Sequence, residues 1–258
     1  MVVFQPDLTE VIVFDLEAFV PPCDRKRKNG ASLAVNPYRA GHTLLGGVIY
    51  RARPLEGVVI ADFEHHWIWR DGSEEEVVKH LFSVFSDAWE HVSTKKRVHC
   101  DPLVLGIGIS TFDLPFLAAK CQEYRVAAPE IIYETVCKLR VVDLATAGIG
   151  FLQIPRPVLH PCTHNELANG FLGERDQKPT GKRVWEMADE MEYAEIEKRC
   201  EGEVREMVAM MNVMTGLCQK IGSSIIVCEH GPSSHELQGL RRLQGFRSHR
   251  RWSQALHG

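Results

Sequence analysis

Apolar runs and helical repeats alternate along the chain and predict its secondary structure. Continuous apolar runs at residues 11–14, 103–109 and 139–145 are typical of buried strands. Residues 42–52 and 57–69 also have strand character, and the short link between them predicts an antiparallel hairpin. We therefore expect five strands, three of them before the first helix.

Helical patterns follow the first three strands. Ser73 and Glu76 form a capping box in front of an apolar stripe, which predicts a helix over residues 73–92. Further helices are expected at 112–124, at 163–171 and over most of 185–220. An antiparallel start followed by alternating helices and strands indicates an α/β domain with a mixed sheet and helices on its faces.

The composition agrees with a globular domain outside the membrane. Apolar residues make up 45% and charged residues 25% of the 258 residues, no run approaches 18 apolar residues, and the N-terminus lacks a signal segment. We therefore expect a cytoplasmic protein without a membrane partner.

The cysteines do not indicate a disulfide framework. There are 8 of them, scattered and without a C-x-x-C pair, so reduced thiols are expected. His160, Cys162 and His164 come closest to a metal motif, but their alternate spacing beside a proline is not typical of a zinc finger.

Positive charge is concentrated in a chain whose net charge is -4. Basic residues cluster at Arg25, Lys26, Arg27 and Lys28, at Lys95, Lys96 and Arg97, and beyond residue 229. Each cluster is consistent with a solvated loop, and together they are also consistent with a positive groove for nucleic acid. The Gly-, Ser-, His- and Arg-rich end predicts a domain over residues 1–228 and a basic, flexible tail over 229–258.

Two carboxylates interrupt the first strand, VIVFDLEAF. Asp15 and Glu17 point to the same face, about 7 Å apart along the strand. Neighbouring carboxylates at the end of a buried strand repel each other and lose solvation, and Mg²⁺ or Mn²⁺ relieves both effects. The pair is therefore either a metal site or a strand end that faces water.

Two further acids could complete such a site. Asp113 follows the apolar run 103–109 at the start of a predicted helix, a position that also suits an N-cap. Glu203 lies on the apolar stripe of the last predicted helix, where an acid is costly unless it is paired or binds a metal. The alternative for Glu203 is a place at the edge of the stripe, near the helix surface.

These motifs resemble those of a known family. The Asp-x-Glu of the first strand, STFDLPFL at a strand-to-helix junction and CEGEVREMVAMM in a late helix are similar to the three exonuclease motifs of the DEDD family. Its members are 3'–5' exonucleases of the ribonuclease H-like superfamily, and they include the proofreading domains of family B DNA polymerases. The resemblance covers about residues 9–217. It implies a ribonuclease H-like mixed five-stranded sheet whose first three strands form an antiparallel meander.

The resemblance also implies metal-assisted hydrolysis of phosphodiester bonds. In the family, four acids hold two divalent ions, Mg²⁺ or Mn²⁺, across the scissile phosphate. Asp15, Glu17 and Asp113 match three of the four acids, and Glu203 falls at the fourth, which is normally Asp.

The chain departs from the family close to Glu203. One branch of the family has a tyrosine four residues before the fourth acid, and another has a histidine five residues before it. Here Arg199 and Lys198 occupy these positions. Arg199 is therefore expected beside the metal ligands in place of a water-orienting base, and Asp143 either supports the same site or starts a turn.

Aromatic and basic side chains are candidates for contacts with nucleic acid. Phe112 and the residues from Arg25 to Lys28 are the predicted contacts. Trp67 and Trp69, like Phe112, either stack on unpaired bases or pack in the core. His65 and His66 are expected at the surface.

The leading hypothesis is a Mg²⁺- or Mn²⁺-dependent 3'–5' exonuclease that acts on single-stranded DNA at its 3' end. Little base discrimination is expected, because binding would rest on phosphates and stacking. One alternative is a nucleic-acid-binding relative whose catalysis is weakened by Glu203 and Arg199. Another is an exoribonuclease that trims RNA.

Overall fold

The computed structural model describes residues 10–25, 35–52, 63–94, 101–152, 154, 158–174 and 178–228. The chain divides into two compact units, Met1–Met211 and Asn212–Gly258. Of the second unit, residues 212–228 are described, as the end of the last helix. The predicted tail at 229–258, like Lys26, Arg27 and Lys28, lies outside the described residues.

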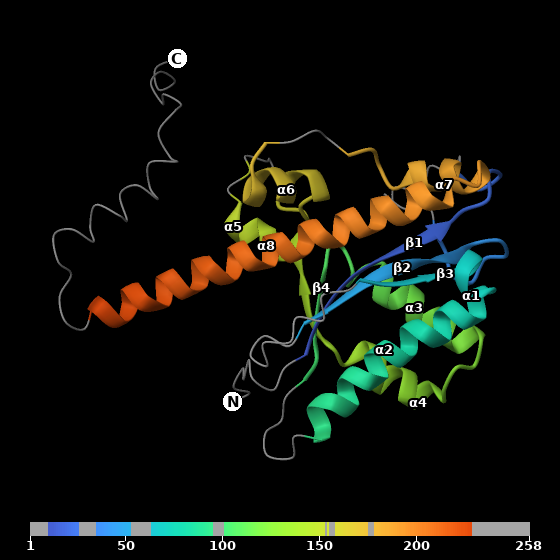
Figure 1. Ribbon diagram of the computed structural model, residues 1–258, viewed down its shortest axis with the longest axis horizontal. Helices are drawn as coiled ribbons and strands as arrows, with labels where there is room; N and C mark the ends of the chain where they lie inside the picture. Colours follow the sequence, from blue (N-terminus) through green and yellow to red (C-terminus); the bar gives the residue numbers. More distant parts are fainter. Residues whose placement is uncertain are drawn as a thin grey trace. The chain divides into compact units, whose positions relative to one another are not determined.

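Five strands form one mixed sheet in the order β3-β2-β1-β4-β5 (Figure 1). They are β1 (Val11–Phe19), β2 (Thr43–Ala52), β3 (Glu64–Trp67), β4 (Leu103–Gly106) and β5 (Arg140–Asp143). The first three strands pair antiparallel, whereas β1 pairs parallel with β4 and β4 with β5. This topology confirms the predicted α/β, ribonuclease H-like fold with its antiparallel meander.

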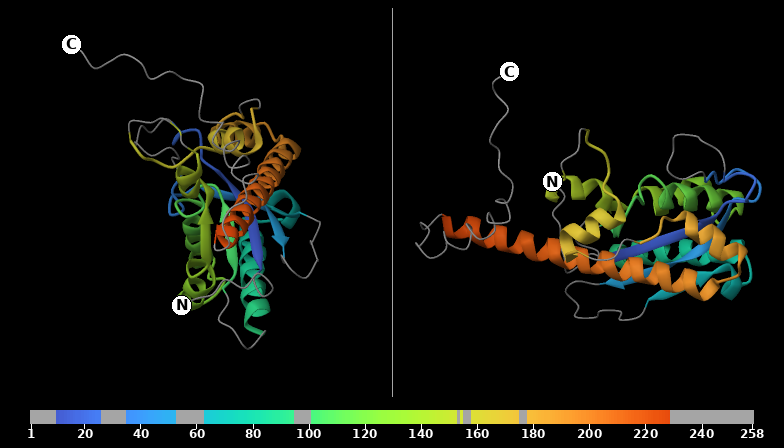
Figure 2. Two further views of the ribbon diagram at one scale, coloured as in Figure 1. Left: turned by 90° about the vertical axis from the view of Figure 1, so that its left-hand side faces the viewer. Right: turned by 90° about the horizontal axis from the view of Figure 1, so that it is seen from above.

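Helices lie on both faces of the sheet. They are α1 (Ile68–Asp71), α2 (Glu74–Thr94), α3 (Asp113–Glu123), α4 (Pro129–Ile132), the π-helical turn η2 (Tyr133–Cys137), α5 (Leu144–Phe151), α6 (His164–Leu172), α7 (Lys182–Asp189) and α8 (Tyr193–Cys228). α2 and α3 cover one face, and residues 193–211 of α8 cross the other (Figures 1 and 2). Among the described residues, no helix combines the length and apolar character needed to cross a membrane.

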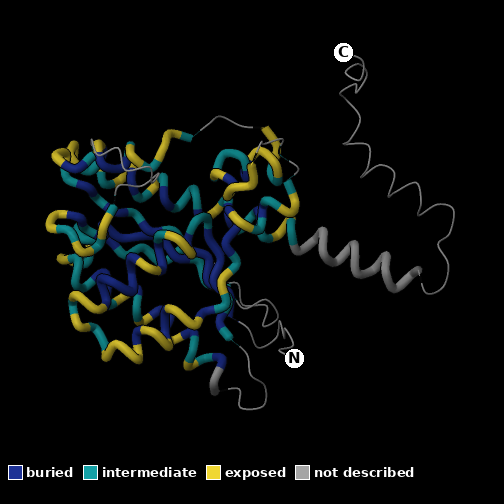
Figure 3. Tube along the Cα trace, turned by 180° about the vertical axis from the view of Figure 1, so that it is seen from behind, coloured by how far each residue is buried: buried dark blue, intermediate teal, exposed yellow. Residues whose placement is uncertain are grey.

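The main hydrophobic core lies between the sheet and α2. Alternate residues of β1, among them Phe14 and Leu16, point into it, and the ring of Phe85 in α2 meets Phe14 edge-on at 5.4 Å. Such aromatic pairs add roughly 0.5–1.5 kcal/mol to the burial of their surface. Buried residues, dark blue in Figure 3, follow the strands through the molecule. Strand alternation therefore leaves Asp15 and Glu17 on the opposite face, towards α8.

A β-bulge bends β1 directly after Glu17. The register with β2 shifts between Glu17 and Ala18, where Gly46 stands opposite Glu17. Gly46 has φ 144°, and a Cβ atom there would overlap the backbone of β3 at His66. Glycine therefore allows β3 to approach closely, and the bulge redirects the strand end that carries the two carboxylates.

The predicted end of the third strand is wrong. The third strand was expected over 57–69, but it ends at Trp67, and the next four residues form α1, which Gly72 closes with φ 93°. Its predicted beginning, up to residue 62, lies outside the described residues. The prediction that residues 185–220 are mainly helical is confirmed: α7 and α8 cover this region, and the chain turns between them where Met191 has φ 57°.

Candidate metal-binding active site

The end of β1 presents Asp15 and Glu17 to α8. The thiol of Cys200 in α8 lies 3.3 Å from Asp15 Oδ2 and donates a hydrogen bond to it. Burial, and then the charge of Asp15, raises the pKa of Cys200 well above its ordinary value of 9.0. Cys200 is therefore a neutral donor that fixes one carboxylate oxygen.

Asp113 is the first residue of α3 and is only 3% exposed. Its Oδ1 accepts a 3.0 Å hydrogen bond from the backbone N–H of Leu16. β4 pairs with β1 only as far as Val13, so the Asp113 side chain takes the place of a strand partner where the two strands separate. The N-cap alternative for Asp113 is wrong, because Phe112 holds the N-cap position.

Glu203 on α8 is joined to this region by Arg199. Arg199 Nη2 pairs with Glu203 Oε1 at 3.0 Å, and Arg199 Nε lies 3.7 Å from Glu17 Oε1. Its Nη1 donates to the carbonyl oxygen of Pro179 at 3.1 Å. The guanidinium therefore lies between carboxylates of β1 and α8, while within the described part of the chain its buried Nε makes no hydrogen bond.

Burial and repulsion raise the pKa values of the β1 carboxyls. Burial raises the pKa of Glu17 from 4.5 to about 8, with Glu203 and Asp113 adding to the rise and Arg199 opposing it. The pKa of Asp15 is also well above its ordinary value, because of burial and then the charges of Glu203, Glu17 and Asp113. The four acids therefore influence one another in one region.

Asp113 responds in the same way. Burial raises its pKa from 3.8 to about 7, although the hydrogen bond from Leu16 opposes the rise. The charges of Asp143 and Glu203 add to it. A buried carboxyl group whose pKa lies near neutral pH marks a candidate functional site.

Divalent cations fit this set of donors. Mg²⁺ and Mn²⁺ prefer carboxylate oxygens, and their positive charge would offset the repulsion that raises the pKa values. The four acids do not meet at a single point, because no three of them offer ligand oxygens that all lie within 4.8 Å of one another. This spread is compatible with two ions about 4 Å apart.

Asp143, at the end of β5, organises the loop that leads to Asp113. Its carboxylate accepts hydrogen bonds from the backbone N–H of Gly108 at 2.9 Å and of Ser110 at 3.1 Å, and from the Ser110 hydroxyl. It also caps α5 through the N–H of Ala145 at 3.0 Å. Asp143 therefore starts a helix and positions the loop before Asp113.

A further polar cluster, which is not predicted from the sequence, continues from Glu203. His164 Nδ1 lies 3.8 Å from Glu203 Oε2, and its Nε2 lies 2.6 Å from Glu206 Oε2. Lys178 Nζ binds the same Glu206 oxygen at 2.9 Å. The cluster brings an imidazole next to the fourth acid from a separate helix.

A capping box is the sequence signal from which the position of His164 could have been found. Thr163 and Glu166 cap each other and begin α6 at His164, which turns this histidine towards α8. The sequence grouped His164 with His160 and Cys162 as the nearest approach to a metal motif. These three described residues do not form a common ligand group.

The predicted nucleic-acid contacts make protein contacts of their own. Arg25 forms an ion pair with Asp189 of α7 at 2.5 Å and lies over the ring of Phe19. Phe112 packs partly against the core, 5.5 Å from the ring of Phe116. Binding of nucleic acid by Arg25 and Phe112 stays a prediction.

The aromatic and histidine residues of β3 mostly serve packing. Trp67 is fully buried, and Trp69 stacks between Trp67 and Tyr193 at the start of α8. His65 and His66, which were expected at the surface, are only partly exposed, at 16% and 19% of their side chains.

The sequence matches no protein-family model and no curated protein. Among solved structures, the chain is similar to the family B DNA polymerase from the hyperthermophilic archaeon Pyrobaculum calidifontis, with a TM-score of 0.52 and 14% identity over 79% of this chain and 24% of that chain. It is also similar to E. coli Exonuclease I in complex with a dT13 oligonucleotide, with a TM-score of 0.46 and 11% identity over 90% of this chain and 46% of that chain.

The chain thus spans about a quarter of the polymerase and less than half of Exonuclease I. The likeness to the polymerase shows the fold, which is like that of the DEDD 3'–5' exonucleases, as the motif resemblance predicted.

Proposed function

We propose that this protein is a metal-dependent 3'–5' exonuclease that removes nucleotides from the 3' end of single-stranded DNA. The observation that carries the proposal is that Asp15, Glu17, Asp113 and Glu203 come from three elements into one region, where burial and the neighbouring acids raise the pKa values of Asp15, Glu17 and Asp113. Buried like charges of this kind are costly unless cations offset them. The choice of a DNA 3' end rests on the resemblance of the three motifs.

These four carboxylates would hold two Mg²⁺ or Mn²⁺ ions. When bound, such ions lower the pKa of water and stabilise charge on the leaving oxygen. In the reaction the oxygen of water forms a bond to phosphorus, the bond from phosphorus to the 3' oxygen breaks, and a nucleoside 5'-monophosphate leaves.

Several side chains of the chain would position the site. Cys200 fixes Asp15, and Arg199 holds Glu17 and Glu203 on either side of its guanidinium. A guanidinium suits a phosphate oxygen, so Arg199 would also meet the substrate's negative charge. Asp143 would keep Asp113 in place through the loop at 108–110.

The test uses a 5'-labelled single-stranded DNA oligonucleotide and Mn²⁺. The wild-type protein is expected to give a ladder that shortens from the 3' end, and Asp15→Asn is expected to lower the rate at least about 100-fold. Asp87→Asn removes an exposed carboxylate on α2 and is the matched control. A wild-type protein without metal-dependent cleavage, or an active Asp15→Asn variant, would contradict the proposal.

One observation favours a second candidate, a nucleic-acid-binding relative with weakened catalysis. Arg199 already occupies one oxygen of Glu203 and approaches one oxygen of Glu17, where the ions would bind. Binding of the oligonucleotide without cleavage would support this candidate. An RNA oligonucleotide of the same sequence tests the exoribonuclease alternative, which faster RNA cleavage would favour.

A further inference from the structure

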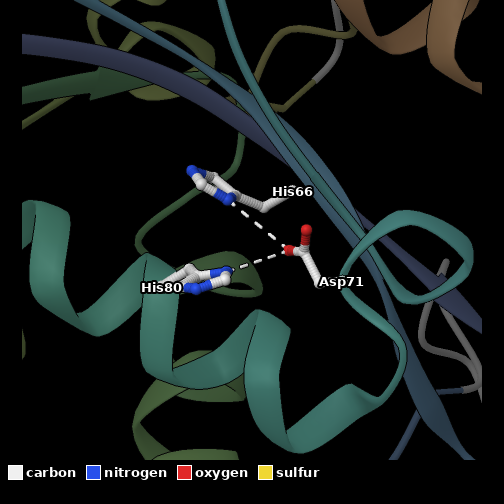
Figure 4. A group of neighbouring side chains, drawn as sticks. All are labelled: His66, Asp71 and His80. Carbon is white, nitrogen blue, oxygen red and sulfur yellow. Dashed lines mark hydrogen bonds and ion pairs between the residues drawn. The ribbon is translucent and has the colours of Figure 1, made fainter.

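A second group of potential metal ligands lies at the edge of the sheet, made by His66 of β3, Asp71 at the end of α1 and His80 of α2. Asp71 Oδ2 lies 3.1 Å from His80 Nδ1 and 3.6 Å from His66 Nδ1 (Figure 4). One ligand atom from each residue lies within 4.8 Å of the other two. Two imidazoles and a carboxylate thus face a common point.

The distances are close to those of a zinc site. Zn²⁺ binds histidine nitrogen and carboxylate oxygen at about 2.0–2.2 Å, which places neighbouring ligands of a tetrahedron roughly 3.3 Å apart. The two distances to Asp71 lie on either side of this value. Imidazole ligands favour Zn²⁺ over the Mg²⁺ or Mn²⁺ that suits carboxylates. We propose that His66, Asp71 and His80 bind one Zn²⁺ ion, with water as the fourth ligand.

The surroundings of His66 give independent support. Its Nε2 is buried and makes no hydrogen bond with any described residue, and it lies 3.9 Å from Glu64 Oε2 on the same strand face. A histidine that binds metal usually directs its other ring nitrogen to such a carboxylate. If Nε2 carries the proton, Nδ1 presents a lone pair to the oxygen of Asp71, and a cation between these two acceptors resolves their repulsion.

This zinc site is separate from the carboxylate site. His66 is paired with Gly47, which is paired with Leu16, so the His66 side chain lies on the α2 face of the sheet. Asp15 and Glu17 lie on the other face. The ion would join the edge strand β3 to α1 and α2, a structural role that does not depend on the proposed nuclease activity.

The test measures zinc retained by the full-length protein. The protein is stripped with EDTA, given Zn²⁺ and gel-filtered, and its zinc content is measured by mass spectrometry. The wild type is expected to retain about one Zn²⁺ more per chain than His80→Gln, a substitution at a half-exposed position. Competition with a chromophoric chelator is expected to show binding weakened by more than about 10-fold in His80→Gln, and by about 10-fold in Glu64→Gln.

Two controls separate this site from the rest of the chain. His65→Gln changes the neighbouring histidine, which faces α8 and pairs with Glu201, and it is expected to keep the ion. Asp87→Asn, at an exposed position of α2, is expected to keep it as well. Equal zinc retention by the wild type and His80→Gln would overturn the proposal, and so would loss of the ion in His65→Gln. Four-coordinate Co²⁺ absorption in the wild type, absent in His66→Gln and His80→Gln, would support it.

Discussion

Replacing Glu17 with Gln is expected to stabilise the metal-free protein at alkaline pH. Glu17 is only 12% exposed and lies close to Arg199, with Glu203 beyond it. Gln keeps nearly the same size and removes the charge. The substitution therefore tests whether burial and repulsion of this carboxylate destabilise the fold.

The magnitude follows from the raised pKa. Between pH 4.5 and about 8 the folded state keeps a proton on Glu17 that the unfolded state has released. Stability that is fully present below pH 4.5 is therefore lost as the pH rises through about 8. The whole rise in the pKa of Glu17 corresponds to a loss of roughly 5 kcal/mol in the free energy of unfolding. Because Asp15 and Asp113 can keep protons and relieve part of the repulsion, we expect roughly 2–4 kcal/mol.

The assay is urea unfolding in EDTA at about pH 4.5 and about pH 9, followed by circular dichroism. Glu17→Gln is expected to match the wild type at the acidic pH and to exceed it by roughly 2–4 kcal/mol at the alkaline pH. Asp87→Asn, on the exposed side of α2, should show no such change.

With metal added, the charge of Glu17 is expected to stabilise the protein instead of destabilising it. Mn²⁺ at about 100 times its Kd should stabilise the wild type by about 2.7 kcal/mol and Glu17→Gln by less. A stability difference between the two proteins that is the same at both pH values would refute the reasoning, because it would show that the charge of Glu17 is not what destabilises the fold.

Three further substitutions probe the frame of the site. Arg199→Ala removes the cation that lowers the pKa of Glu17, so the loss of stability should move to a higher pH in the same titration; no movement would contradict this. Asp113→Asn keeps an acceptor for the N–H of Leu16, whereas Asp113→Ala should be about 1–3 kcal/mol less stable in urea, and equal stabilities would argue against that role. Gly46→Ala should cost more than about 3 kcal/mol or prevent folding, as measured by thermal unfolding, because its Cβ would overlap β3; a stable variant would exclude this overlap.

Local periodicity was sufficient for much of the fold. The apolar run of β1 and the stripe of α2 are signals within single elements, and both elements form where they were predicted. The boundary between β3 and α1 was missed because Trp67, Ile68 and Trp69, which span it, are all strand-forming residues. Gly72 closes the helical turn locally, whereas the stacking of Trp67 and Trp69 on Tyr193 is a tertiary contact that no local pattern reports.

The same limit applies to the candidate site. Strand alternation placed Asp15 and Glu17 on one face, and helical spacing placed Glu203 on the inner side of its helix. The approach of His164 to Glu203 was beyond such reasoning, because it depends on how α6 and α8 lie side by side. Periodicity within one helix does not report its distance from another.

Contacts at several positions along α8 fix the rotation of this helix about its axis. Tyr193 stacks on Trp69, the carboxylate of Glu197 binds Trp69 and Arg70, and Cys200 reaches Asp15. These contacts follow one side of the helix for two turns before Glu203. Since each residue turns an α-helix by about 100°, inserting a single residue between Cys200 and Glu203 would point the last acid away from the other three. The spacing within this helix, as much as the identity of its acid, therefore determines whether a fourth ligand exists.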